Sequence, residues 1–173
     1  MDSFRRLTNQ TGVDDSKDAA DWDAVEEVTE LLHEERFHEA LTMIREILTR
    51  DATNPYAFYF MGIALFEVGE IAPARDAYRA CLRLAPTHLG ARVALSHVLR
   101  MLGELKEAVQ EAQNALDQAP GDADALYAGG LAFYARGENA AAKRYLEAFL
   151  EQGPEFEVGS EVKAMLAGMD QRN

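Results

Sequence analysis

The amino-acid sequence predicts an all-α protein in which helix-turn-helix units stack in a row to form a solenoid. The first observation is that three residue types return at one fixed spacing of 34 residues. The second is that apolar residues between these markers recur at the three- and four-residue spacing of an amphipathic helix. We therefore expect about four units and no β-strands. The repeated markers are Gly69, Gly103 and Gly137; Ala74, Ala108 and Ala142; and Pro86, Pro120 and Pro154.

The chain begins with residues 1–20, which are rich in Asp, Ser, Thr and Lys and poor in apolar groups. We expect this segment to be disordered, because it cannot bury enough surface to offset the entropy lost on ordering. Residues 21–54 follow as a first, degraded unit, in which Glu35 and Ala52 stand where later units have glycine and proline. This unit holds ten acidic residues against three arginines, which suits a terminal repeat with one side in water.

Residues 55–88 form the most regular unit. Its first predicted helix carries Phe58, Met61 and Leu65 at helical spacing and ends at Gly69, because glycine tolerates a left-handed backbone. A second helix then runs until Pro86, whose ring cannot continue a helix.

Two further units, residues 89–122 and 123–156, keep the same register. In the first of them Arg92 stands where a large apolar residue is expected, so we predict one weak packing contact there. In the second, bulky Phe149 stands at a position that is usually small. Residues 155–169 should form a capping helix, followed by a tail at 170–173. The residues expected to pack this helix against the last unit are Phe156, Val158, Val162, Met165 and Leu166.

This 34-residue helix-turn-helix period resembles the tetratricopeptide repeat family. The resemblance covers about residues 21–169 and rests on the glycine, alanine and proline series. It implies a right-handed superhelix whose first helices line a concave groove. The groove positions that the family pattern assigns in this chain are Tyr56, Tyr59, Ile63 and Phe66; Val93, His97 and Arg100; and Tyr127, Leu131 and Tyr134.

The residues at these positions predict the kind of ligand. Family members that grip acidic carboxy-terminal tails place lysine and asparagine where this chain has Tyr59 and Ile63, so that clamp is absent. Tyrosine rings offer a large contact area for few rotatable bonds. We therefore expect an extended segment with spaced apolar anchors, for which His97 and Arg100 are polar handles. The alternative is that the N-terminal segment or a second copy of the chain covers these rings.

Composition narrows the partners and the location. The net charge of −13 disfavours nucleic acid, because affinity for nucleic acid comes mainly from Lys and Arg that neutralise phosphates. We expect no membrane insertion, since no run of about twenty apolar residues occurs, and no secretory signal, since the first ten residues lead into polar sequence. The single cysteine cannot form an internal disulfide, which fits a cytoplasmic protein.

No catalytic or metal-binding pattern stands out. His33 and His38 resemble a zinc signature, but they lie five residues apart instead of four and straddle a predicted turn. Cys81 falls where two helices approach closely, which predicts a buried and inert thiol. We expect no catalytic residues, no metal and no cofactor, and hence no enzyme.

The sequence therefore favours a non-enzymatic protein–protein interaction module, a scaffold or client chaperone that binds an extended apolar or aromatic peptide. A narrower resemblance is to the bacterial type III secretion chaperones of translocator proteins. It rests on the small acidic chain, the polar N-terminal segment, the repeats and the entry into the last helix at 154–156. A self-assembling structural protein, with a homodimer as its simplest form, stays open as the other hypothesis.

Overall fold

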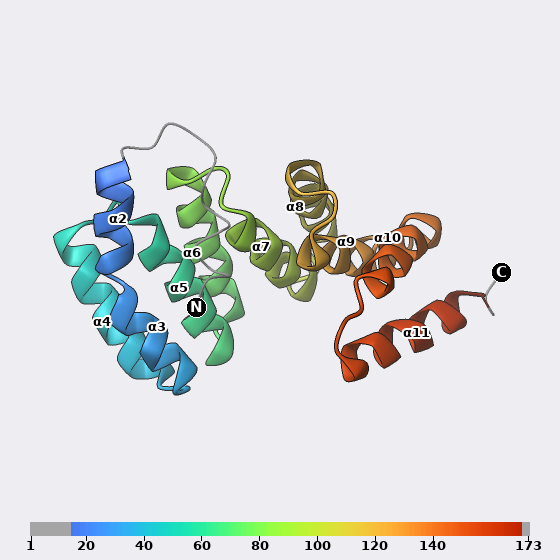
Figure 1. Cartoon of the computed structure of the whole chain (residues 1–173), viewed down its shortest axis with the longest axis horizontal. Helices are drawn as coiled ribbons and strands as arrows, with labels where there is room; N and C mark the ends of the chain where they lie inside the picture. Colours follow the sequence, from blue (N-terminus) through green and yellow to red (C-terminus); the bar gives the residue numbers. More distant parts are fainter. Residues whose placement is uncertain (1–14, 171–173) are drawn as a thin grey trace.

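The structure of the protein is a computed structural model, and it describes residues 15–170. All regular secondary structure in this part of the chain is α-helical. The helices form a row that follows the chain from α2 to α11 (Figure 1). Their bounds are α2 (Asp15–Asp23), α3 (Glu26–His33), α4 (Phe37–Arg50), α5 (Pro55–Glu67), α6 (Ile71–Leu84), α7 (Leu89–Met101), α8 (Leu105–Gln118), α9 (Ala123–Ala135), α10 (Asn139–Glu151) and α11 (Phe156–Asp170).

The helices pack as pairs, α3 with α4, α5 with α6, α7 with α8 and α9 with α10, and each pair contacts the next. This arrangement confirms the all-α solenoid predicted from the repeat. The buried apolar residues fall into two clusters, one from Val25 to Phe60 and a larger one from Ala74 to Met169. Tyr59 and Ile63 of α5 pack against both clusters. Helix α5 is therefore the element that joins the two parts of the core.

The same backbone turn joins the two helices of every unit. In the later units the turn residue is Gly69, Gly103 or Gly137, with φ of 84°, 77° and 83°. This is the left-handed region, which glycine enters at no steric cost. In the first unit Glu35 adopts the same conformation, with φ of 57°. In all four turns the following amide donates a hydrogen bond to the carbonyl five residues earlier, at 2.8 or 2.9 Å.

A side chain caps the first helix of each later unit. The capping residue accepts a hydrogen bond from the backbone amide three residues on, which satisfies one of the free N–H groups of the helix. The pairs are Asn54 with Ala57 at 3.0 Å, His88 with Ala91 at 3.1 Å, and Asp122 with Ala125 at 2.9 Å. These caps lie 34 residues apart, so they belong to the repeat, although the three residue types differ.

Small residues allow the two helices of a later unit to approach closely. A Cβ atom added at Gly62 would collide with the ring of Tyr78, and one added at Gly130 would collide with Leu146. The equivalent Ser96 is fully buried and donates a hydrogen bond from its Oγ to the carbonyl of Ala108. In the first unit the same position holds Val28, which is also fully buried.

Helix α2 corrects the expectation for the start of the chain. It begins at Asp15, so the predicted disorder is wrong for residues 15–20, while residues 1–14 lie outside the described residues. Polar contacts attach α2 to the next unit. The hydroxyl of Tyr56 donates to the carboxylate of Asp18 at 2.6 Å, and the side-chain amide of Asn54 donates to the carbonyl of Asp21 at 2.8 Å.

Two other expectations about packing change. Phe156 is 87% exposed, so the prediction that it packs against the last unit is wrong, while Val162 and Met169 of α11 are buried. At Arg92 the contact is polar where an apolar one was expected, and the Nε atom of Arg92 is buried with no hydrogen-bond partner within the described residues. Its guanidinium forms an ion pair with Glu111 at 2.7 Å that links α7 to α8, and both side chains are largely buried.

Candidate functional site

The ten predicted groove residues lie on α5, α7 and α9, and we call their common surface the groove face. Helices α7 and α9 contact each other directly. The rings of His97 and Tyr127 lie 5.9 Å apart, and Tyr127 lies 4.9 Å from Phe149. Groove residues from two consecutive units are thus neighbours in space, as the repeat register implies.

Three of the ten residues serve mainly as packing between helices. Tyr56 and Val93 are only 4% and 8% exposed. Tyr59 lies with its ring 4.5 Å from the ring of His88 and in close contact with Gly90, and burial raises the pKa of its hydroxyl to about 12. These side chains offer little contact area to a ligand.

The remaining seven residues are half-buried: Ile63, Phe66, His97, Arg100, Tyr127, Leu131 and Tyr134. Met101 adjoins them at the end of α7 and is 51% exposed, which makes it one of three large apolar side chains that the described part of the chain exposes most. The groove face therefore presents apolar and aromatic groups that are only partly covered.

The polar groups on this face have an unusual electrostatic setting. Burial, together with the nearby Arg100, lowers the pKa of His97 to about 4, so the imidazole is neutral at pH 7. The Nε atom of Arg100 is buried and has no hydrogen-bond partner within residues 15–170. A buried N–H group without a partner is costly, so a ligand toward which the Arg100 side chain turned this donor would gain affinity.

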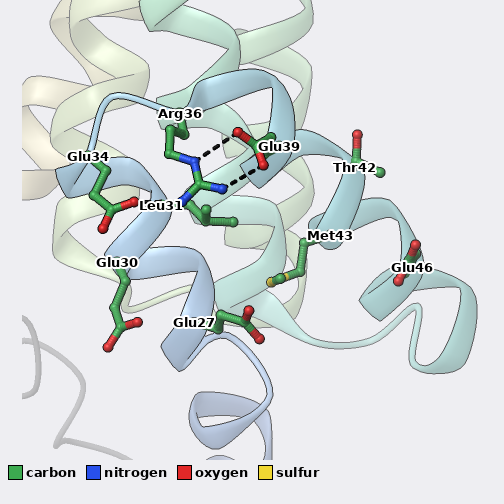
Figure 2. A pocket seen from close by; sticks show the side chains of 9 residues that line it. All are labelled: Glu27, Glu30, Leu31, Glu34, Arg36, Glu39, Thr42, Met43 and Glu46. Atoms are coloured by element: carbon green, nitrogen blue, oxygen red, sulfur yellow. Dashed lines mark hydrogen bonds and ion pairs between the residues drawn. The ribbon is translucent and has the colours of Figure 1, made fainter.

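A pocket of about 380 Å³ lies between α3 and α4, at the opposite end of the molecule from α11 (Figures 1 and 2). We call it the acidic pocket, because five carboxylates line it: Glu27, Glu30, Glu34, Glu39 and Glu46. Leu31 and Met43 point toward each other across its middle (Figure 2). The sequence signalled only the acidity of this unit, which is equally typical of a solvated surface.

A second, smaller pocket of about 180 Å³ lies beside α2, and its lining includes Lys17, Asp18, Tyr56, Leu84 and His88. Trp22 of α2 lies edge-on to Tyr56, with ring centroids 5.3 Å apart. Helix α2 therefore covers the end of the groove face at which Tyr56 was predicted to bind a ligand.

Cys81, His33 and His38 are the residues that the sequence raised as possible catalytic or metal-binding groups, and the structure shows the setting of each. Cys81 is fully buried, and burial raises the pKa of its thiol to about 12. His33 and His38 are exposed, and the Nδ1 atom of His33 lies 2.8 Å from the carbonyl of Thr29. Within residues 15–170 no group of three or more His, Cys, Asp and Glu side chains is placed to hold a metal ion.

None of the helices described is both long and apolar enough to cross a membrane.

Comparisons with known proteins agree with this architecture. A tetratricopeptide repeat family model matches residues 25–88 and 61–123, and a second tetratricopeptide repeat model matches residues 124–155. None of the curated proteins matches the chain with significance.

Several solved structures share the fold. A MamA fragment from Desulfovibrio magneticus RS-1 is 19% identical with a TM-score of 0.69, covering 88% of this chain and 96% of the other. A thermophilic repeat protein from Thermus thermophilus, TTC0263, is 22% identical with a TM-score of 0.67, covering 86% and 80%. A repeat protein from Parabacteroides merdae is 19% identical with a TM-score of 0.73, covering 86% and 58%. At these identities the likeness concerns the fold alone.

Proposed function

Because the chain belongs to the tetratricopeptide repeat family, we propose that it is a non-enzymatic module that binds an extended peptide segment on its groove face. The fold of this family serves protein–protein interaction. The finer proposal is that the ligand is a segment of a client protein with spaced apolar anchors, for which the chain acts as a scaffold or chaperone. We also propose a cytoplasmic location. The resemblance to bacterial translocator chaperones stays a prediction.

The observation that carries the proposal is the combination of Arg100 and Met101 at the end of α7. Arg100 has a buried Nε donor without a partner among the described residues, and Met101 exposes half of its surface beside it. An extended peptide carries unpaired backbone carbonyls at regular spacing, together with side chains that alternate in direction. Such a ligand can place an apolar side chain on Met101, and it can accept a hydrogen bond from Arg100 when the Arg100 side chain turns its Nε toward the ligand.

The test uses peptides that the full chain enriches from a random display library. Each enriched peptide is titrated against the unaltered protein and against Arg100→Gln, with fluorescence anisotropy as the readout. We expect about tenfold weaker binding for the variant, the effect of losing one well-placed hydrogen bond in a partly buried site. Lys106→Gln on α8 is the matched control, because it removes an exposed charge away from the groove face.

Equal affinity of the enriched peptides for the Arg100 variant and for the Lys106 control would refute the proposed site. Circular dichroism of both variants shows that any loss of binding does not come from loss of the helical fold.

A further inference from the structure

Among the described residues, the outer side of the first unit is one end of the row of helix pairs. In the later units the first helix packs against the second helix of the unit before it, as α5 does on α4 and α7 does on α6. Within residues 15–170 no helix pair precedes α3, so the side of α3 and α4 that holds the acidic pocket has no such neighbour.

The acidic pocket combines an apolar floor with unpaired negative charge. Leu31, which is 7% exposed, and the half-buried Met43 form the floor. Arg36 pairs with Glu34 and with Glu39, each at 2.7 Å, and so offsets one of the two negative charges on that side of the rim (Figure 2). The other rim carboxylates form no ion pair within the described residues. These are Glu27, Glu30 and Glu46.

Such a pocket fits a short segment with adjacent positive charges and apolar side chains next to them. The chain itself contains such a segment outside the described helices, Phe4-Arg5-Arg6-Leu7, which holds its sole pair of adjacent arginines. Each arginine is flanked by an apolar residue that could contact Leu31 and Met43. Both the charge and the hydrophobicity of the segment therefore complement the pocket.

The connecting chain is long enough for this contact within one molecule. Asp15, the first residue of α2, lies eight positions after Leu7, and an extended chain of this length spans about 26 Å. Glu30 lies fifteen positions after Asp15, which at the rise of a helix is about 23 Å. A segment that turns back beside α2 and α3 reaches the rim of the pocket.

We propose that residues 4–7 dock in the acidic pocket of their own molecule. Phe4 and Leu7 contact the apolar floor, and the two arginines pair with the unpaired rim carboxylates. This contact is distinct from ligand binding on the groove face and stands without it.

The test is disulfide trapping in the full chain with Ser3→Cys and Thr42→Cys. Thr42 is exposed on α4 and lines the pocket. The native Cys81 does not compete, since it is fully buried and burial raises the pKa of its thiol to about 12. Under mild oxidation we expect a monomeric product with an internal disulfide. Pairing Ser3→Cys with Gln113→Cys, which is exposed on α8, gives the background rate.

Charge variants identify the cause of trapping. We expect Glu27→Gln combined with Glu30→Gln to slow it about fivefold, since two exposed charge pairs together contribute about 1 kcal/mol. We expect Glu147→Gln with Glu151→Gln, two exposed carboxylates on α10, to leave the rate unchanged. Phe4→Ser should also slow trapping, because it removes an apolar anchor.

Three results would overturn the proposal. The first is trapping at Thr42→Cys no faster than at Gln113→Cys. The second is a rate that does not respond to neutralising Glu27 and Glu30. The third is a product that consists of disulfide-linked dimers, because the segment would then occupy the pocket of a second copy.

Discussion

In the first unit Glu35 makes the turn between the two helices, whereas in the three later units a glycine makes it. The hydrogen bond that closes the turn is the same in all four units. The close-approach position likewise holds Val28 in the first unit and Gly62, Ser96 or Gly130 in the others. The comparison teaches that the backbone plan of the repeat survives residues that fit it poorly, while close helix packing depends on the small residues.

The first unit also differs from a later unit in its balance of acidic and basic residues. The first unit has ten acidic residues against three basic ones, and the third unit, residues 89–122, has five against three. In the third unit the most buried ion pair, between Arg92 and Glu111, joins α7 to α8. In the first unit most carboxylates face water or the acidic pocket. Charged side chains thus form a packing contact inside the solenoid, whereas in the first unit they form an exposed acidic surface.

The largest effect should come from giving a later unit the close-approach residue of the first. We expect Gly62→Val to lower the free energy of unfolding by about 3 kcal/mol, because the added atoms overlap the buried ring of Tyr78. Chemical denaturation measures the loss. Gly121→Val is the control, since a Cβ at Gly121 meets no atom within 4 Å. Equal stabilities of the two variants would show that the second unit accommodates valine at this position, as the first unit does with Val28.

A smaller effect should distinguish the histidine cap of α7 from the caps of the other units, through the pH dependence of stability. Burial lowers the pKa of His88 to about 4 from its ordinary value of 6.5, so the unfolded chain binds the proton more readily between these values. The stability due to neutral His88 is therefore complete above pH 6.5 and is lost as the pH falls toward 4. Protonation also removes the acceptor that caps α7, since both ring nitrogens become donors.

His88→Asn copies the cap that Asn54 provides one unit earlier. We expect the variant to lose about 2 kcal/mol less stability than the natural chain between about pH 7 and pH 4.5. Denaturation curves at the two pH values give the difference. His97 is present in both proteins, so its own titration cancels. Parallel pH profiles would mean that the cap of α7 does not depend on the neutral imidazole.

The smallest effect concerns the turns. Glu35→Gly should raise the free energy of unfolding by about 1 kcal/mol, because glycine removes the cost of a left-handed backbone from the first unit. The reciprocal Gly103→Glu should lower it by a similar amount, since open space surrounds Gly103 and only backbone strain is added. Thermal unfolding compares the two variants. If both substitutions changed the melting temperature in the same direction, the turns of the first and third units would not be equivalent.

The fold could be predicted from the sequence because three residue series with different physical roles keep one spacing. The caps at Asn54, His88 and Asp122 follow the same spacing, yet their differing side chains hide the pattern. Helix α2 was missed because hydrogen bonds and an ion pair attach it, and a search for apolar surface does not detect such contacts.

The candidate site was predicted in part. The repeat register assigned residues to the groove face, but it could not show that Tyr56 lies under α2 or that Tyr59 fills the space beside Gly90. Burial of this kind depends on neighbours from other units. The acidic pocket was missed because its glutamates look like an ordinary solvated helix surface until Leu31 and Met43 are placed between them.

The buried Cys81 gives the protein its own chemical reporter. The chain has a single thiol, and it is fully covered in the folded state. An alkylating reagent therefore reacts with it only during moments when α6 separates from its neighbours. The labelling rate in native buffer measures how often the middle of the solenoid opens, and comparison with the rate in denaturant gives the free energy of that opening without any label being engineered into the chain.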